Sequence, residues 1–132
     1  MTRVLVVQRD RSVAAEMAEE LHGAGYEVEL CGGPLHEPCP VIDDLPCPLV
    51  DRADVLVYDA WAAGDSDAGR RLISELRDVY VDLPVVLTSA DESVQWVERE
   101  GAHRVFPLPG RPTPEALVHT IEIALADQGM AV

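Results

Sequence analysis

Ala53-Asp-Val-Leu-Val-Tyr-Asp59 is the most informative stretch of this 132-residue chain. Residues 55–58 are apolar or aromatic, and a carboxylate stands on either side of them. A short run without polar alternation is typical of a strand covered on both faces, as in the centre of a parallel sheet. Ligands and chemistry gather at the carboxyl ends of such strands. Asp59 is therefore the first candidate functional residue.

Four other segments are predicted to be strands. Residues 4–7 and 83–87 are further continuous apolar runs, and residues 104–108 form the last strand. Residues 26–30 alternate apolar and acidic side chains, which predicts an edge strand with one solvent-exposed face.

Helical patterns lie between these strands. Ser12 is predicted to cap a helix whose apolar residues recur at helical spacing. Further helices are expected from about Ser66, over residues 91–100, and from Thr113 onward. The alternation predicts a doubly wound α/β fold with a parallel five-stranded sheet, in a single domain spanning residues 1–132.

Residues 31–51 break this alternation with a proline- and cysteine-rich insert. It contains a near-repeat, Pro38-Cys-Pro-Val-Ile-Asp43 and Pro46-Cys-Pro-Leu-Val-Asp51. Because prolines so close together forbid a regular helix, we expect a loop in place of the second helix.

Three interpretations of the thiols in this insert remain open. Cys31, Cys39 and Cys47 are small enough to serve as buried core filler in an extended loop. Together with His36 they are also a legitimate ligand set for zinc or an iron–sulfur cluster, although the spacing lacks the close ligand pairs of common motifs. Cys39 and Cys47 are the expected partners if the thiols form a redox pair.

Composition excludes several classes of function. The net charge is −14, there is no Lys, and the ten basic residues form no patch, so direct nucleic-acid binding is not expected. No apolar run approaches the length that spans a bilayer, and no signal peptide is visible. We expect a cytoplasmic protein with no membrane partner.

The order and spacing of five segments resemble the receiver domain of bacterial response regulators. These segments are Val4-Leu-Val-Val7, Val55-Leu-Val-Tyr-Asp59, Pro84-Val-Val-Leu-Thr-Ser89, Gly101-Ala102, and the final strand with its Pro. The resemblance covers nearly the whole chain except residues 31–51. It implies a phospho-accepting acid after the third strand, a Mg²⁺-binding acid pair after the first, a sensing hydroxyl after the fourth, and a Lys before Pro in the fifth.

Carried over by position, the resemblance places the phospho-acceptor at Asp59 and the sensing hydroxyl at Thr88. The Lys position falls on Leu108, before Pro109, and the aromatic switch position on Val105.

The acid pair of the family falls on Gln8 and Arg9, with Asp10 as the next residue. Phosphoryl transfer to a carboxylate brings negative charges together, and Mg²⁺ with a cation offsets their repulsion. Mg²⁺ prefers carboxylate oxygens, so Gln8 is a poor ligand and Arg9 would repel the ion. Arg9 could instead pair with Asp59. The residues therefore predict a pseudo-receiver, with Mg²⁺ binding not expected.

We expect a non-enzymatic, stand-alone signalling module without a cofactor, acting through protein–protein interaction. By resemblance, residues 91–126 form the face for a homodimer or another protein partner. Two alternatives remain: a metal- or redox-sensing protein that uses Cys31, Cys39 and Cys47, and a residual phospho-receiver at Asp59.

Overall fold

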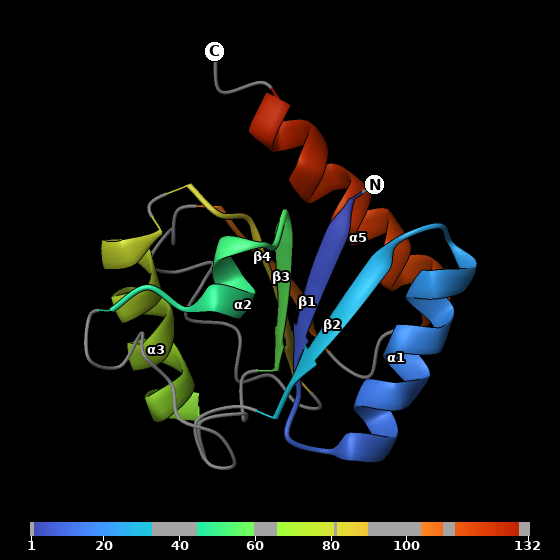
Figure 1. Ribbon diagram of the computed structural model, residues 1–132, viewed down its shortest axis with the longest axis horizontal. Helices are drawn as coiled ribbons and strands as arrows, with labels where there is room; N and C mark the ends of the chain where they lie inside the picture. Colours follow the sequence, from blue (N-terminus) through green and yellow to red (C-terminus); the bar gives the residue numbers. More distant parts are fainter. Residues whose placement is uncertain are drawn as a thin grey trace.

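The computed structural model describes residues 2–32, 45–59, 66–80, 82–89, 104–109 and 113–129 (Figure 1). The elements in chain order are β1 (Arg3–Val7), α1 (Arg11–Gly23), β2 (Glu27–Cys31), α2 (Pro48–Asp51), β3 (Val55–Asp59), α3 (Ser66–Val79), β4 (Val85–Ser89), β5 (Val105–Pro109) and α5 (Pro114–Gly129). The helix predicted over residues 91–100 lies outside the described residues. None of the described helices has the length and apolar character needed to cross a membrane.

The five strands form one sheet in the order β2-β1-β3-β4-β5, and every neighbouring pair is parallel. β3 lies at the centre and β2 at an edge, as the sequence predicts. Residues 55–58 of β3 are all buried, because helices cover both faces of the sheet. The predicted doubly wound α/β fold is confirmed.

Two apolar clusters fill the space between the sheet and its helices. α1 and α5 cover one face and α2 and α3 the other, as Figure 1 shows. Successive residues of β1 contribute to opposite clusters: Val4 and Val6 pack toward α1 and α5, whereas Leu5 and Val7 pack toward α3. A strand buried on both faces must be apolar at every position, which accounts for the uninterrupted runs.

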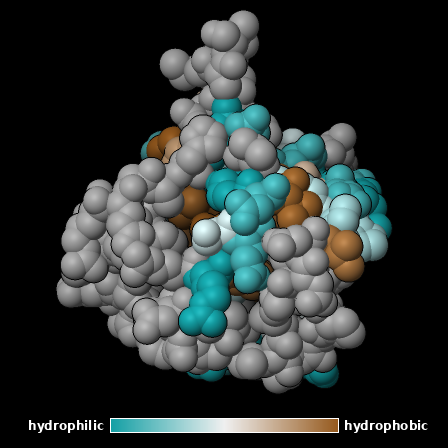
Figure 2. Space-filling view, turned by 90° about the vertical axis from the view of Figure 1, so that its left-hand side faces the viewer, coloured by the Kyte–Doolittle hydropathy of each residue, from teal (hydrophilic) through white to brown (hydrophobic). Residues whose placement is uncertain are grey.

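On the side that carries α2 and α3, hydrophilic and hydrophobic residues are interspersed over the described surface (Figure 2).

The edge strand β2 differs from the prediction in which side chains meet solvent. Glu27 and Glu29 are half-buried, because Arg3 contacts both of them at 2.9 and 3.7 Å and Arg52 contacts Glu29 at 2.7 Å. Leu30, predicted to lie on the covered face, is 46% exposed. Tyr26 and Val28 still pack against the cluster beneath α1 and α5, and the ion pairs partly cover the opposite, acidic face of the strand.

The predicted cap of α1 is wrong by two positions. Asp10, not Ser12, is the N-cap, and its Oδ1 atom accepts the N–H groups of Ser12 at 2.9 Å and Val13 at 3.3 Å. Asp and Ser both cap helices well, so which of the two residues becomes the N-cap depends on where the helix begins after β1.

The insert contains a one-turn helix where the sequence predicts only a loop. α2 begins at Pro48, a position where the missing N–H of proline costs nothing, and Asp51 donates its N–H to the Cys47 carbonyl at 2.8 Å. The proline argument therefore fails for the last residues of the insert. Residues 33–44, which include His36 and Cys39, lie outside the described residues.

Candidate functional site at the carboxyl edge of the sheet

Three of the predicted site residues lie in a row across the carboxyl edge of the sheet. Asp59 ends β3 and is in register with Thr88 of β4, which is in register with Leu108 of β5. Thr88 is 3% exposed and Asp59 is half-buried. The parallel register thus brings together residues that are far apart in sequence.

Gln8 follows β1 and faces inward, with 9% of its surface exposed. Its main-chain N–H donates to the Cys31 carbonyl at 3.0 Å, and its side-chain Oε1 accepts the N–H of Asp10 at 3.2 Å. The side-chain oxygen that would have to replace an acidic metal ligand is therefore already used to hold the turn after β1.

Asp10 was a candidate pocket acid because it follows the acid-pair positions directly. The structure places its Oδ1 atom on the first turn of α1, where it accepts two backbone N–H groups. Asp10 thus acts as a helix cap.

Arg9 is exposed, and the predicted ion pair with Asp59 is wrong. Among the residues that the structure describes, the ion pairs join Arg3 and Arg52 to glutamates of β2, and none joins Arg9 to Asp59.

Leu108 occupies the position at which the resemblance implies a Lys. Its side chain is half-buried and packs against the apolar cluster beneath α1 and α5. Val105, at the aromatic switch position, is buried in the opposite cluster. Both side chains contribute to the core, and neither brings charge to the site.

These donors do not fit Mg²⁺. The ion prefers several carboxylate oxygens and water in octahedral geometry. Of the candidate ligands, Gln8 holds a turn, Arg9 carries positive charge and Asp10 caps a helix, which leaves the Asp59 carboxylate. Within the described ranges, no three His, Cys, Asp or Glu side chains are grouped so that they could hold a metal ion.

The side chains of Cys31 and Cys47 are half-buried and pack against the apolar cluster on the α3 side of the sheet. This placement agrees with the core-filler interpretation for these two residues. The predicted site formed with His36 and Cys39, and the redox pair of Cys39 and Cys47, involve residues outside those described and remain predictions.

Sequence reasoning missed Tyr80, which holds α2 in place. Its hydroxyl accepts the N–H of Cys47 at 2.8 Å and contacts the carboxylate of Asp51. Burial, followed by the hydrogen bond with Asp51, raises the pKa of Tyr80 to about 12. Its position directly after α3 gives no sequence signal for these contacts, because the partners lie 33 and 29 residues away.

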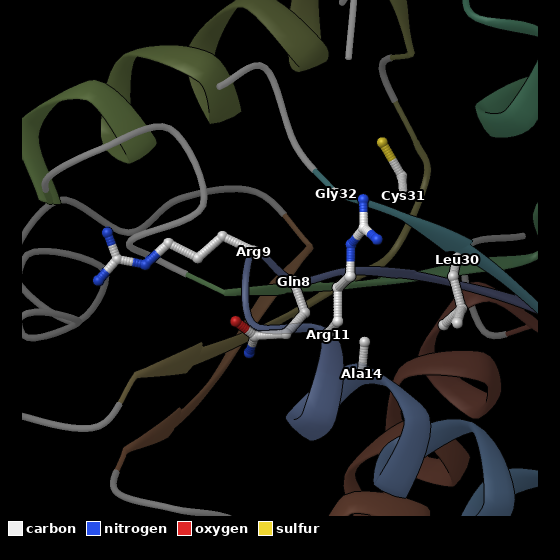
Figure 3. Close-up of a pocket in the computed structure, with 7 residues that line it drawn as sticks. All are labelled: Gln8, Arg9, Arg11, Ala14, Leu30, Cys31 and Gly32. Carbon is white, nitrogen blue, oxygen red and sulfur yellow. The ribbon is translucent and has the colours of Figure 1, made fainter. Parts of the chain in front are cut away.

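A cavity of about 340 Å³ beside the candidate site was also missed (Figure 3). It is lined by the turn after β1, the start of α1 and the end of β2, through Gln8, Arg9, Arg11, Ala14, Leu30, Cys31 and Gly32. No single segment predicts it, since the cavity arises only when these three segments meet.

No family model matches the sequence, and no curated protein does either. Solved structures do match. The response regulator receiver domain protein (CheY-like) from Methanospirillum hungatei JF-1 is 15% identical, with a TM-score of 0.76 over 100% of this chain and 99% of that one. A receiver domain protein from Clostridium thermocellum is 12% identical, with a TM-score of 0.76 over 100% of both chains. The response regulator TrrA from Thermotoga maritima, solved in complex with Mg²⁺-BeF, is 20% identical, with a TM-score of 0.69 over 95% of this chain and 100% of that one.

These similarities extend over 95–100% of the chain and agree with the strand order. The chain therefore has the fold of a CheY-like response regulator receiver domain.

Proposed function

We propose that this protein is a pseudo-receiver, a non-enzymatic signalling module that acts through protein–protein interaction without Mg²⁺-dependent phosphorylation. The proposal rests on which residues occupy the two acid-pair positions and on how their side chains are placed. Gln8 is buried with its side-chain oxygen engaged, and Arg9 is an exposed cation.

The charges around Asp59 support the same conclusion. A phosphoryl donor approaching a carboxylate needs a metal ion and a cation to offset the repulsion. Leu108 supplies an apolar side chain where the resemblance implies a cation, and Arg9 forms no ion pair with Asp59 within the described part of the site. Asp59 and Thr88 keep their places in the fold without the groups that would make Asp59 an efficient acceptor.

The direct test is incubation of the intact chain with acetyl phosphate and Mg²⁺, followed by intact-mass measurement. We expect no phosphorylated species that depends on Asp59, with Asp59→Ala as the matched control. A phosphoryl adduct that forms on the natural chain and is lost in Asp59→Ala would establish the residual phospho-receiver instead.

The proposed interaction face, residues 91–126, includes most of α5. This helix buries Leu117, Ile121 and Ala124 against the sheet and leaves Ile123 46% exposed. An exposed large aliphatic side chain beside a buried stripe is suited to the apolar centre of an interface. A second copy of the chain is the partner that can be tested without further components.

We expect the natural chain to self-associate as its concentration rises, and Ile123→Asp to weaken this by introducing an unpaired charge into the contact. Sedimentation over a concentration series measures the effect. Leu45→Asp is the matched control, because Leu45 is 56% exposed and lies outside this face. A chain that stays monomeric throughout, or that responds equally to both substitutions, would contradict the homodimer.

A further inference from the structure

The cavity between β1, β2 and α1 has the dimensions and position of a small-molecule site. Its volume of about 340 Å³ falls within the usual range for ligand pockets. It opens at the carboxyl edge of the parallel sheet, where α/β folds place ligands. Figure 3 shows the Arg11 side chain extending from the start of α1 toward Cys31 and Gly32 at the end of β2, whereas Arg9 points the other way.

The charge of this cavity is opposite to that of the whole chain. Two of the ten basic residues, Arg9 and Arg11, line it, and the described residues of its lining include no Asp or Glu although the chain carries 24 of them. Asp10 lies between the two arginines in sequence, but its carboxylate caps α1.

The arginines of this cavity are available to a ligand. Among the described residues, the guanidinium groups of Arg9 and Arg11 take part in no ion pair. Arg3 and Arg52 behave differently, since both are held by Glu29. Guanidinium groups favour carboxylate and phosphate oxygens, which they bind through two parallel N–H groups.

The walls of the cavity are fixed in place. Val7 and Cys31 are in register across β1 and β2, and the N–H of Gln8 donates to the Cys31 carbonyl at 3.0 Å. The first turn of α1 is held by its cap. The apolar part of the lining comes from Ala14 and from Leu30, which is 46% exposed on the edge strand.

We propose that this cavity binds a small organic anion. Arg11 receives the carboxylate or phosphate group, Arg9 adds positive charge at the rim, and a short apolar portion of the ligand contacts Leu30 and Ala14. The site needs neither Mg²⁺ nor Asp59, so it goes beyond the proposed function and does not depend on it.

The test is a titration of the isotope-labelled full chain, followed by backbone amide shifts in NMR spectra. Phenyl phosphate and benzoate are the anionic probes and distinguish the two acid groups, and benzyl alcohol is the uncharged probe. We expect saturable shifts at Ala14, Cys31 and Gly32 with at least one anionic probe, and a Kd about tenfold weaker in Arg11→Gln because a charge-assisted contact is lost. Arg71→Gln, an exposed arginine of α3 outside the cavity lining, is the matched control and should bind as the natural chain does.

Three results would overturn the proposal. One is the lack of saturable shifts with both anions. Another is binding that Arg11→Gln leaves unchanged or that Arg71→Gln weakens equally. The third is equal binding of benzyl alcohol, which would show that the cavity recognises the apolar ring alone.

Discussion

At the scale of single residues, the turn after β1 uses the side chains of Gln8 and Asp10 for local structure. Gln8 turns inward and accepts the N–H of Asp10, while Asp10 accepts the first free N–H groups of α1. The Gln8 side chain thus holds the backbone of the turn, and the Asp10 side chain holds the start of the helix. In this arrangement both side chains stabilise the turn and the start of α1.

The cap makes a prediction about stability. Asp10→Ala should lower the free energy of unfolding by about 1 kcal/mol, because two N–H groups lose their acceptor. Urea denaturation followed by circular dichroism measures it. Ser12→Ala is the matched control and should change stability by less than about 0.5 kcal/mol, as expected for a surface substitution. A larger loss of unfolding free energy in Ser12→Ala than in Asp10→Ala would show that Ser12, the residue predicted from the sequence, caps the helix.

At the scale of secondary structure elements, α2 depends on α3 through Tyr80. The Tyr80 hydroxyl contacts both the backbone of Cys47, which precedes α2, and the side chain of Asp51, which ends it. A helix of four residues is too short to be stable alone. This tertiary contact is therefore what lets a helical turn form in a segment whose prolines predict a loop.

Tyr80→Phe should consequently destabilise the chain by about 1 kcal/mol at neutral pH, since the N–H of Cys47 and the Asp51 carboxylate lose a partner. The pKa of Tyr80 is raised from 10.0 to about 12 in the folded chain, so the folded state holds this proton more tightly than the unfolded state does. The stabilisation is therefore fully present below pH 10 and is lost as the pH rises toward 12.

The measurement compares the natural chain and Tyr80→Phe by urea denaturation from pH 8 upward. Because both proteins keep Tyr26 and Tyr58, the difference between them isolates Tyr80. The difference should shrink as the pH approaches 12. A constant difference over this range would show that the hydroxyl proton does not contribute.

At the scale of the whole molecule, the fold was predictable because buried strands and the helices that cover them each produce a recognisable pattern in the sequence. Strands covered on both faces give uninterrupted apolar runs such as residues 55–58, and the helices between them give apolar residues at helical spacing. The positions Thr88 and Leu108 came from the family resemblance, and the parallel register places them in a row with Asp59. These features depend on patterns within single segments and on their order.

The features that were not predictable depend on contacts between segments. Glu27 and Glu29 are half-buried because arginines from β1 and from the end of α2 pair with them. The cavity beside Arg11 exists only where three segments meet. The spacing of residues in the sequence does not predict contacts between distant segments.

The central claim is that the carboxyl edge of this sheet lacks a Mg²⁺ site because of two identifiable positions, Gln8 and Arg9. A Mg²⁺ titration followed by NMR amide shifts tests it most directly, on the natural chain and on the double variant Gln8→Asp, Arg9→Asp. Arg71→Asp serves as the control for an added acid elsewhere on the surface.

We predict no saturable Mg²⁺ response at residues 8–10 or Asp59 in the natural chain and in Arg71→Asp, and a saturable response at these residues in the double variant. The restored acids would supply the carboxylate oxygens that the ion prefers. Saturable Mg²⁺ binding at Asp59 in the natural chain would contradict the account.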